Sequence, residues 1–231
     1  MRRRLKRSTA MLLLAVFFAA GCSDGTDSAP TASVKKYERS ELPKTTQELP
    51  PLDQGRVEIP TPKDWQWRSQ EKGILARFHL KGRSGIPQII IKLDGDAASE
   101  ISDVTPENVQ QYADGLQAQL DKQGTKYIEP ARPLILGKNA FARYVMAGKL
   151  PNKQTATLER QILKTTRGGR TYTVELQVPV KELLKYRDPA YAIAAGMVFL
   201  SPDAAADDSK PAEDTPAPET KPSSEPADNA K

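Results

Sequence analysis

The chain offers few side chains that could act as a nucleophile or as a general base. Its 231 residues include one cysteine, Cys22, and one histidine, His79. A serine or cysteine nucleophile needs a histidine or an equivalent base beside it. Ser84, in the segment GRSGI, lacks the G-x-S-x-G spacing of a nucleophile elbow. The sequence therefore predicts no catalytic residue of this kind.

His79 lies in a segment, residues 74–81, where apolar and polar residues alternate with the period of a β-strand. It shares the polar side of this strand with Arg77 and Lys81, whose charges would oppose its protonation. We therefore expect a histidine on the surface, and neither a metal ligand nor a catalytic base.

Carboxylates are the other possible source of chemistry. Glu159 and Glu175 fall on adjacent strand-like segments and could serve a carboxylate-dependent enzyme acting on a glycan, which needs two carboxyl groups roughly 5 to 10 Å apart. Asp94-Gly95-Asp96 has oxygen ligands for calcium, but it lacks the full EF-hand spacing and is more typical of a strand-ending turn. The sequence predicts no metal or cofactor site, and it lacks phosphate-loop, dinucleotide and nucleic-acid motifs.

Two groups of residues could instead bind a partner. Lys164, Arg167 and Arg170 surround a glycine pair at a predicted hairpin tip, where they could meet an anion. Cations at such a tip also serve solubility alone. Trp65 and Trp67 would project from the same side of an extended segment, either as a shelf for a sugar or peptide or as part of the core.

The leader MRRRLKRSTAMLLLAVFFAAGC has three parts: a basic start, an apolar run at 11–18 and small residues at 19–21 before Cys22. Its uncharged stretch, 10–20, is too short for a membrane-spanning helix, which needs about 20 residues. A freely secreted protein with one unpaired cysteine would be unusual. Residues 1–21 resemble the export signal of a bacterial lipoprotein.

This resemblance implies that Cys22 is acylated and becomes the N-terminus of the mature protein. Its acyl chains would then hold the protein in membrane lipid, since two or more chains anchor stably. The location implied is the cell membrane or outer membrane of a bacterium, with the folded domain facing the periplasm or the exterior.

Composition divides the mature chain into three parts. Residues 22–55 are rich in Ser, Thr, Pro and charge, which predicts a flexible tether. Residues 201–231 lack Val, Ile, Leu, Met and aromatic residues, which predicts a disordered acidic tail rich in Pro and Ala. Residues 56–200 have the length of one domain. They hold 22 Lys and Arg against 15 Asp and Glu, so they could attract an anionic partner or simply present a solvated basic surface.

The central part shows a run of strand patterns with helices between and after them. A helix is predicted from Thr105 to Gly124, with Val109, Tyr112, Ala113, Leu116 and Leu120 on its apolar face. Strands are predicted at 57–59, 66–69, 74–81, 87–93, 134–136, 139–147, 155–166 and 171–178, and two short helices at 180–186 and 190–200. This order predicts an α+β fold, an antiparallel sheet flanked by helices.

The phrase formed by Ile59, Pro60, Pro62 and Trp65, followed by this order of elements, resembles the PsbP-like α/β/α sandwich superfamily. That superfamily includes small bacterial envelope lipoproteins. The resemblance covers residues 56–200 and implies the fold, but no position matches a functional motif. We therefore expect a non-catalytic envelope module with an envelope protein or an anion as partner. The alternatives are the glycan enzyme and a small-molecule carrier with an apolar pocket.

Overall fold

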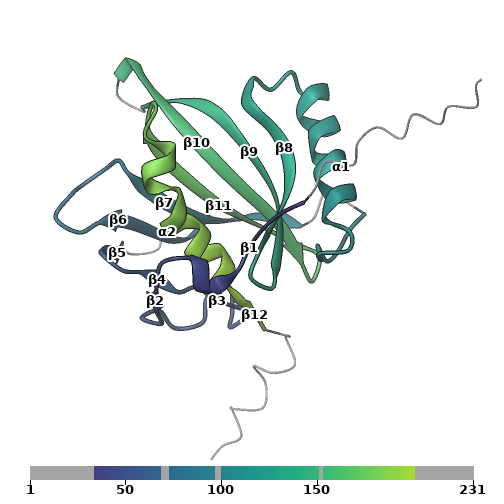
Figure 1. Cartoon of the computed structure of the whole chain (residues 1–231), viewed down its shortest axis with the longest axis horizontal. Helices are drawn as coiled ribbons and strands as arrows, with labels where there is room; N and C mark the ends of the chain where they lie inside the picture. The colour runs from purple at the N-terminus through teal and green to yellow at the C-terminus, as the bar shows by residue number, and fades with distance from the viewer. Residues whose placement is uncertain (1–33, 69–72, 97–99, 151–152, 201–231) are drawn as a thin grey trace, which may run out of the picture. The chain divides into compact units, whose positions relative to one another are not determined.

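The computed structural model describes residues 34–68, 73–96, 100–150 and 153–200 (Figure 1). The predicted signal peptide, Cys22 and the tail 201–231 lie outside the described residues. One large sheet forms the centre of the described chain. Its strands are β1 (Lys35–Tyr37), β5 (Trp65–Arg68), β6 (Ile74–Leu80), β7 (Gln88–Asp96), β8 (Tyr127–Leu136), β9 (Asn139–Leu150), β10 (Lys153–Arg167) and β11 (Arg170–Pro179).

These eight strands lie in the order β1-β8-β9-β10-β11-β7-β6-β5. All neighbours are antiparallel except β1 and β8, which are parallel. Two short ladders lie outside the sheet: β2 (Thr45–Thr46) with β4 (Thr61–Pro62), and β3 (Val57–Glu58) with β12 (Val198–Phe199). The predicted α+β class, with an antiparallel sheet flanked by helices, is confirmed.

The predicted hairpin between β10 and β11 is also confirmed. Its register runs from Leu158 opposite Pro179 to Arg167 opposite Arg170. Gly168 and Gly169 form the two-residue turn with φ of 53° and 71°. A tight turn of this kind needs positive φ at both central residues, which glycine adopts without strain.

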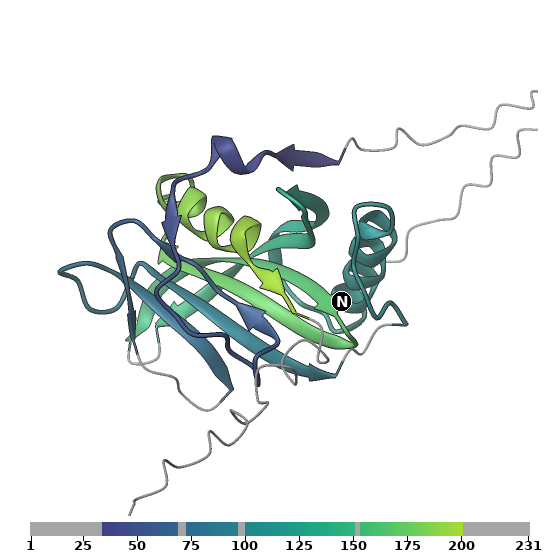
Figure 2. The same cartoon turned by 90° about the horizontal axis from the view of Figure 1, so that it is seen from below.

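The helices α1 (Val109–Lys122) and α2 (Leu183–Gly196) cover opposite faces of the sheet. Ala142 of β9 packs in the cluster that contains α1, whereas Phe141 belongs to the larger cluster that contains α2. Neighbouring residues of a strand point to opposite faces, so the two clusters lie on the two sides of the sheet. Figure 2 shows strands between the two helices. Neither helix of the described chain has the length and apolar character needed to cross a membrane.

The C-terminal part of the domain differs from the prediction, which placed two short helices there with a break between them at residues 187–189. The structure has one helix, α2, with Pro189 inside it. Proline removes one helical hydrogen bond, but Tyr191 and Ile193 are buried against the sheet side of this helix, and this packing holds the two turns together. The helix ends at Gly196, and the next residues extend and pair with β3.

The prediction of a tether over residues 22–55 is wrong from Val34 onward. This segment, here called the N-terminal segment (residues 34–55), contains β1, the short helix η1 (Arg39–Glu41) and β2. It also buries three leucines, which are only 5 to 7% exposed: Leu42, Leu49 and Leu52. Average composition concealed these widely spaced apolar residues, although their burial is enough to dock the segment on the domain.

The N-terminal segment encloses α2. β1 adds to the sheet edge beside β8, while η1 and β2 contact α2. In Figure 2 the purple segment crosses over the green helix. As a result, α2 lies between the sheet on one side and the N-terminal segment on the other, and the chain after α2 emerges next to β3.

Candidate functional site

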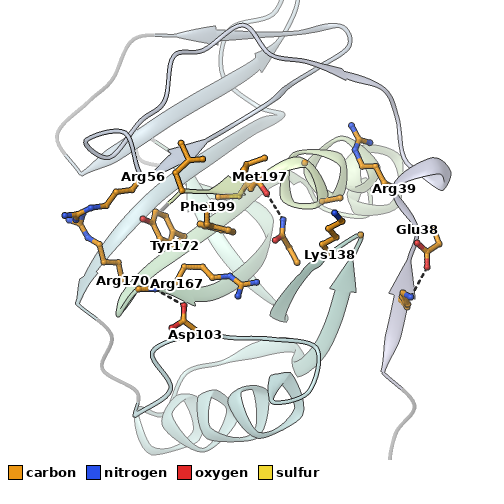
Figure 3. Close-up of a pocket in the computed structure, with 18 residues that line it drawn as sticks. Glu38, Arg39, Arg56, Asp103, Lys138, Arg167, Arg170, Tyr172, Met197 and Phe199 are labelled. Carbon is orange, nitrogen blue, oxygen red and sulfur yellow. Dashed lines mark hydrogen bonds and ion pairs between the residues drawn. The ribbon is translucent and has the colours of Figure 1, made fainter. Parts of the chain in front are cut away.

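A large cavity lies where the N-terminal segment, the β10–β11 hairpin and the end of α2 meet (Figure 3). Its volume is about 1350 Å³. The charged residues that line it are six cations, Lys36, Arg39, Arg56, Lys138, Arg167 and Arg170, and two acids, Glu38 and Asp103. This excess of positive charge makes the cavity, here called the basic cavity, an attractive place for an anion.

Arg167 is the central cation of the basic cavity. Figure 3 shows its guanidinium pointing into the hollow from the end of β10. The guanidinium carbon lies 5.4 Å from the ring centroid of Phe199. Its Nε is buried and has no hydrogen-bond partner within the described chain. Burial lowers the pKa of Arg167, and the charge of Asp103 opposes this shift. Arginine nevertheless stays charged at neutral pH, so this side chain is a charged donor in need of an acceptor.

A second group of cations lies on the other side of Tyr172. Arg170 pairs with Asp53 at 2.7 Å, and the Tyr172 hydroxyl donates to the second oxygen of the same carboxylate, also at 2.7 Å. Burial, together with this hydrogen bond to Asp53, raises the pKa of Tyr172, which therefore remains a donor. Arg56 lies beside Arg170 in Figure 3 and forms no ion pair with any described residue. Asp53 thus pairs with Arg170 alone, which leaves the positive charge of Arg56 uncompensated.

The three remaining cations differ in whether an acid or a hydrogen-bond acceptor of the described chain binds them. Lys36 pairs with Glu38 at 2.9 Å. Arg39 donates to the carbonyl oxygen of Pro43 at 2.9 Å and to the hydroxyl of Thr45 at 2.6 Å, which makes its role structural. Lys138 is exposed at the β8–β9 turn and has no acid within ion-pair distance among residues 34–68, 73–96, 100–150 and 153–200. Lys138 and Arg167 therefore face the hollow with free positive charge.

The wall that carries Phe199 is held in place by hydrogen bonds to backbone carbonyl oxygens. The side-chain amide of Asn139 donates to the carbonyl oxygens of Ala194 and Met197, each at 2.9 Å. The backbone N–H of Leu200 donates to the carbonyl oxygen of Arg56 at 2.8 Å. Asn139 thus satisfies a carbonyl at the end of α2 that lacks a helical partner. The basic cavity is consequently preformed.

The structure brings together two of the three cations that the sequence places at the hairpin. Arg167 and Arg170 are directly paired and both line the basic cavity. Lys164 pairs in register with Thr173 and forms an ion pair with Asp94 at 3.0 Å. Since it is three residues from Arg167 along a strand, it points to the opposite face. Lys164 is therefore not part of this site.

The two tryptophans do not form a shared shelf. Trp65 is 2% exposed and belongs to the main core, whereas Trp67 is 40% exposed on the edge strand β5. Both point to the same side of the strand, as predicted, but only the first reaches the covered part of the sheet. Neither residue lines the basic cavity.

The prediction that His79 lies on the surface is wrong. It is 6% exposed, and its Nδ1 lies 2.9 Å from the carbonyl oxygen of Gly85. A carbonyl can only accept, so Nδ1 carries the proton in this contact. The turn after β6 folds back over the strand end and covers the ring, which alternation alone does not reveal. In the part of the chain that the structure describes, no three His, Cys, Asp or Glu side chains gather as metal ligands.

The proposed carboxylate pair is also wrong. Glu159 lies opposite Val178, and Glu175 lies opposite Ile162, so the two acids project from different faces of the sheet. Glu175 is 1% exposed and accepts hydrogen bonds from Arg160, Lys92 and Gln177. It is thus fully engaged within the protein and cannot share a cleft with Glu159.

The predicted turn at Asp94-Gly95-Asp96 is instead an irregularity near the end of β7. Asp96 pairs with Arg170 and Leu93 with Tyr172, so the chain gains one residue relative to β11. Gly95 has φ of 86°, as such a bulge requires. The Asp94 carboxylate accepts from the Thr173 hydroxyl at 2.7 Å, in addition to its ion pair with Lys164.

A smaller cavity of about 580 Å³ lies between α1 and the sheet. Tyr112 and Leu116 line it, but so do Asp94 and Lys164, which form an ion pair. A carrier of apolar molecules would need mostly apolar walls. The mixed lining of this second cavity does not favour the carrier alternative.

No family model matches the chain, and no curated protein matches it. Similar solved structures include a protein from Bacteroides thetaiotaomicron VPI-5482, which is 12% identical to this chain. The alignment covers 70% of this chain and 50% of that protein, with a TM-score of 0.44. This chain therefore spans half the length of that protein.

Two other solved structures are similar to the chain. Cyanobacterial PsbP (CyanoP) from Synechocystis sp. PCC 6803 has 9% identity over 66% of this chain and 94% of that chain, with a TM-score of 0.39. LpqN, which is involved in cell envelope biogenesis of Mycobacterium tuberculosis, has 15% identity over 63% of this chain and 83% of that chain, with a TM-score of 0.37. The fold class stated above follows from the strand order and the two helical layers of the chain itself.

Proposed function

We propose that this protein is a lipid-anchored, non-catalytic module of the bacterial cell envelope that binds an anionic ligand in the basic cavity. One observation carries the binding role: Arg56, Lys138 and Arg167 line a preformed hollow without an ion-pair partner in the described residues. Uncompensated cations in a partly enclosed site interact with an anion more strongly than they would on an open surface.

The kinds of side chain present support binding more than chemistry. Arginine and lysine keep their protons at neutral pH, and the raised pKa of Tyr172 makes its hydroxyl a donor. A guanidinium presents several N–H groups in one plane, which suits phosphate and carboxylate oxygens. The cavity therefore supplies donors that hold an anion and orient it. The anchoring part of the proposal comes from the leader and from Cys22.

Replacing Arg167 with Gln should weaken anion binding by about tenfold, which is the effect of losing a hydrogen bond to a charged group. The measurement is calorimetric titration of the mature chain with inorganic pyrophosphate at low salt. Lys185→Gln is the matched control because its side chain is 65% exposed and lies outside the basic cavity. The parent affinity should fall as salt screens the cations. Equal affinities for Arg167→Gln and the parent would refute this site.

Replacing Cys22 with Ala should release the mature protein from the membrane fraction, because the acyl chains would have no attachment site. The measurement is incorporation of labelled fatty acid, combined with fractionation of the cells that express the protein. Ser23→Ala serves as a neighbouring control that keeps the cysteine. Persistent membrane retention of the Cys22 variant would count against lipid anchoring.

A further inference from the structure

We infer that the first acidic residues of the tail, Asp203, Asp207 and Asp208, occupy the basic cavity of the same molecule and compete with its external ligand. This inference rests on the proposed function, because it assigns a built-in competitor to the same site. It follows from where the described chain ends, how far the next residues reach and which charges they carry.

The tail starts at the wall of the basic cavity. Phe199 and Leu200 both line the cavity. Phe199 is paired with Val57, and the N–H of Leu200 is bonded to the carbonyl oxygen of Arg56 at 2.8 Å. These contacts fix the departure point of the chain beside the backbone of Arg56, which is one of the cations without an ion pair in the described chain.

The first acids of the tail are within reach of every cation in the cavity. An extended chain covers about 3.3 to 3.6 Å per residue, and a cube of the cavity's volume has an edge of about 11 Å. Asp203 is three residues beyond Leu200, and Asp208 is eight residues beyond it. Asp203 can thus reach most of the way across the hollow, and Asp207 and Asp208 can reach its far side.

The charges of the two parts are complementary. Residues 201–231 carry eight Asp and Glu against three Lys, whereas the cavity is lined by six cations and two acids. The first lysine of the tail, Lys210, comes only after all three of the proximal aspartates. A short linker gives an intramolecular group an effective concentration in the millimolar range, so pairing with a dissociation constant about tenfold below that concentration would keep the cavity mostly occupied.

The expected contact is weak enough to be displaced. The tail has no Val, Ile, Leu, Met or aromatic residue, so it can offer carboxylates but little apolar surface. Contacts between charges alone are screened by salt. A ligand with several anionic oxygens on one compact group would therefore exchange with the tail. The tail sets the concentration of ligand at which the cavity fills.

The first test uses the full mature chain with Asp203→Asn, Asp207→Asn and Asp208→Asn together. We expect pyrophosphate affinity at low salt to rise by about tenfold over the parent, and the difference to disappear at high salt. The matched control is Glu219→Gln, Glu225→Gln and Asp228→Asn, which removes the same charge far along the tail. This control should bind as the parent does. Equal affinities for all three chains would overturn the inference.

The second test detects the contact directly. A water-soluble carbodiimide joins a carboxylate to a lysine amine in contact with it: the amide bond forms, and the reagent takes up the lost water and becomes a urea. We expect mass spectrometry to find Asp203, Asp207 or Asp208 joined to Lys138, and added pyrophosphate to suppress that product. Joining to the exposed Lys185 at an equal yield would overturn the inference.

The two proposals fail in different ways. If pyrophosphate binding depends on Arg167 but the proximal tail variant binds as the parent does, the tail inference is wrong and the anion site stands. If neither the parent nor the proximal tail variant binds pyrophosphate, the proposed anion site is wrong as well, since no competitor remains to explain the lack of binding.

Discussion

A chain that begins at Arg56 will lose at least about 5 kcal/mol of unfolding free energy relative to one that begins at Val34, or will fail to fold. The deletion removes three leucines that are at most 7% exposed: Leu42, Leu49 and Leu52. Burial of one such side chain contributes roughly 1.5 to 3 kcal/mol. It also removes β1 and uncovers one side of α2. Urea denaturation of the two chains measures the difference.

Single substitutions separate loss of packing from loss of chain length. Leu49→Ala should cost about 2 to 4 kcal/mol because it leaves a cavity in the core. Leu184→Ala is the matched control, since Leu184 lies on α2 but is 73% exposed, and it should change stability by less than about 0.5 kcal/mol. Equal denaturation midpoints for chains starting at Val34 and at Arg56 would show that the N-terminal segment does not stabilise the domain.

Replacing Glu175 with Gln will lower the unfolding free energy at pH 7 by about 3 kcal/mol, since removal of one partner leaves the other charges uncompensated. Glu175 is 1% exposed on β11 and forms ion pairs with Arg160 at 2.6 Å and Lys92 at 2.5 Å. These two cations are about 30% exposed, so water relieves part of the cost. Glu182→Gln, at a position 42% exposed, is the control and should be nearly neutral.

The same carboxylate makes stability depend on pH in the acid range. Burial alone would raise the pKa of Glu175, but hydrogen bonds from Arg160, Lys92 and Gln177 outweigh it and hold the pKa at about 2, below the ordinary 4.5. Because the folded-state pKa is the lower one, the contribution is complete above pH 4.5 and is lost as the pH falls toward 2. The difference between parent and Glu175→Gln stability should therefore shrink over this range. A difference that does not change between pH 6 and pH 2.5 would contradict it.

Local patterns in the sequence predicted much of the fold. The five residues predicted for the apolar face of the first helix are all buried in α1: Val109, Tyr112, Ala113, Leu116 and Leu120. The glycine pair correctly placed the β10–β11 hairpin. Both signals depend only on neighbours along the chain, namely helical spacing and turn chemistry. The three buried leucines of the N-terminal segment, Leu42, Leu49 and Leu52, are too few and too far apart to define a helical or a strand period. Their burial depends on contacts with elements that are distant in the sequence.

The candidate site could be predicted only in part, for the same reason. Arg167 and Arg170 were identified because the hairpin joins them. Arg56 and Lys138 come from segments far away in the sequence, and only the tertiary fold brings them to the same cavity. One signal was available: Lys164 and Arg167 have opposite parity on a strand, which places them on opposite faces. His79 was misplaced because alternation describes the strand but not the turn that covers it.

The N-terminal segment would make anion binding in the basic cavity sensitive to force on the chain. Lys36 and Arg39 line the cavity, and they lie in and just after β1, which is joined to β8 over only three residue pairs. An anion that bridges Lys36 and Arg167 would fasten β1 to the domain. By reciprocity, tension on the chain that peels β1 away would weaken the hold on the anion by the same free energy. If the protein is anchored through Cys22, as proposed above, that tension would come from the membrane side, and pulling on the N-terminal segment would favour release of the anion.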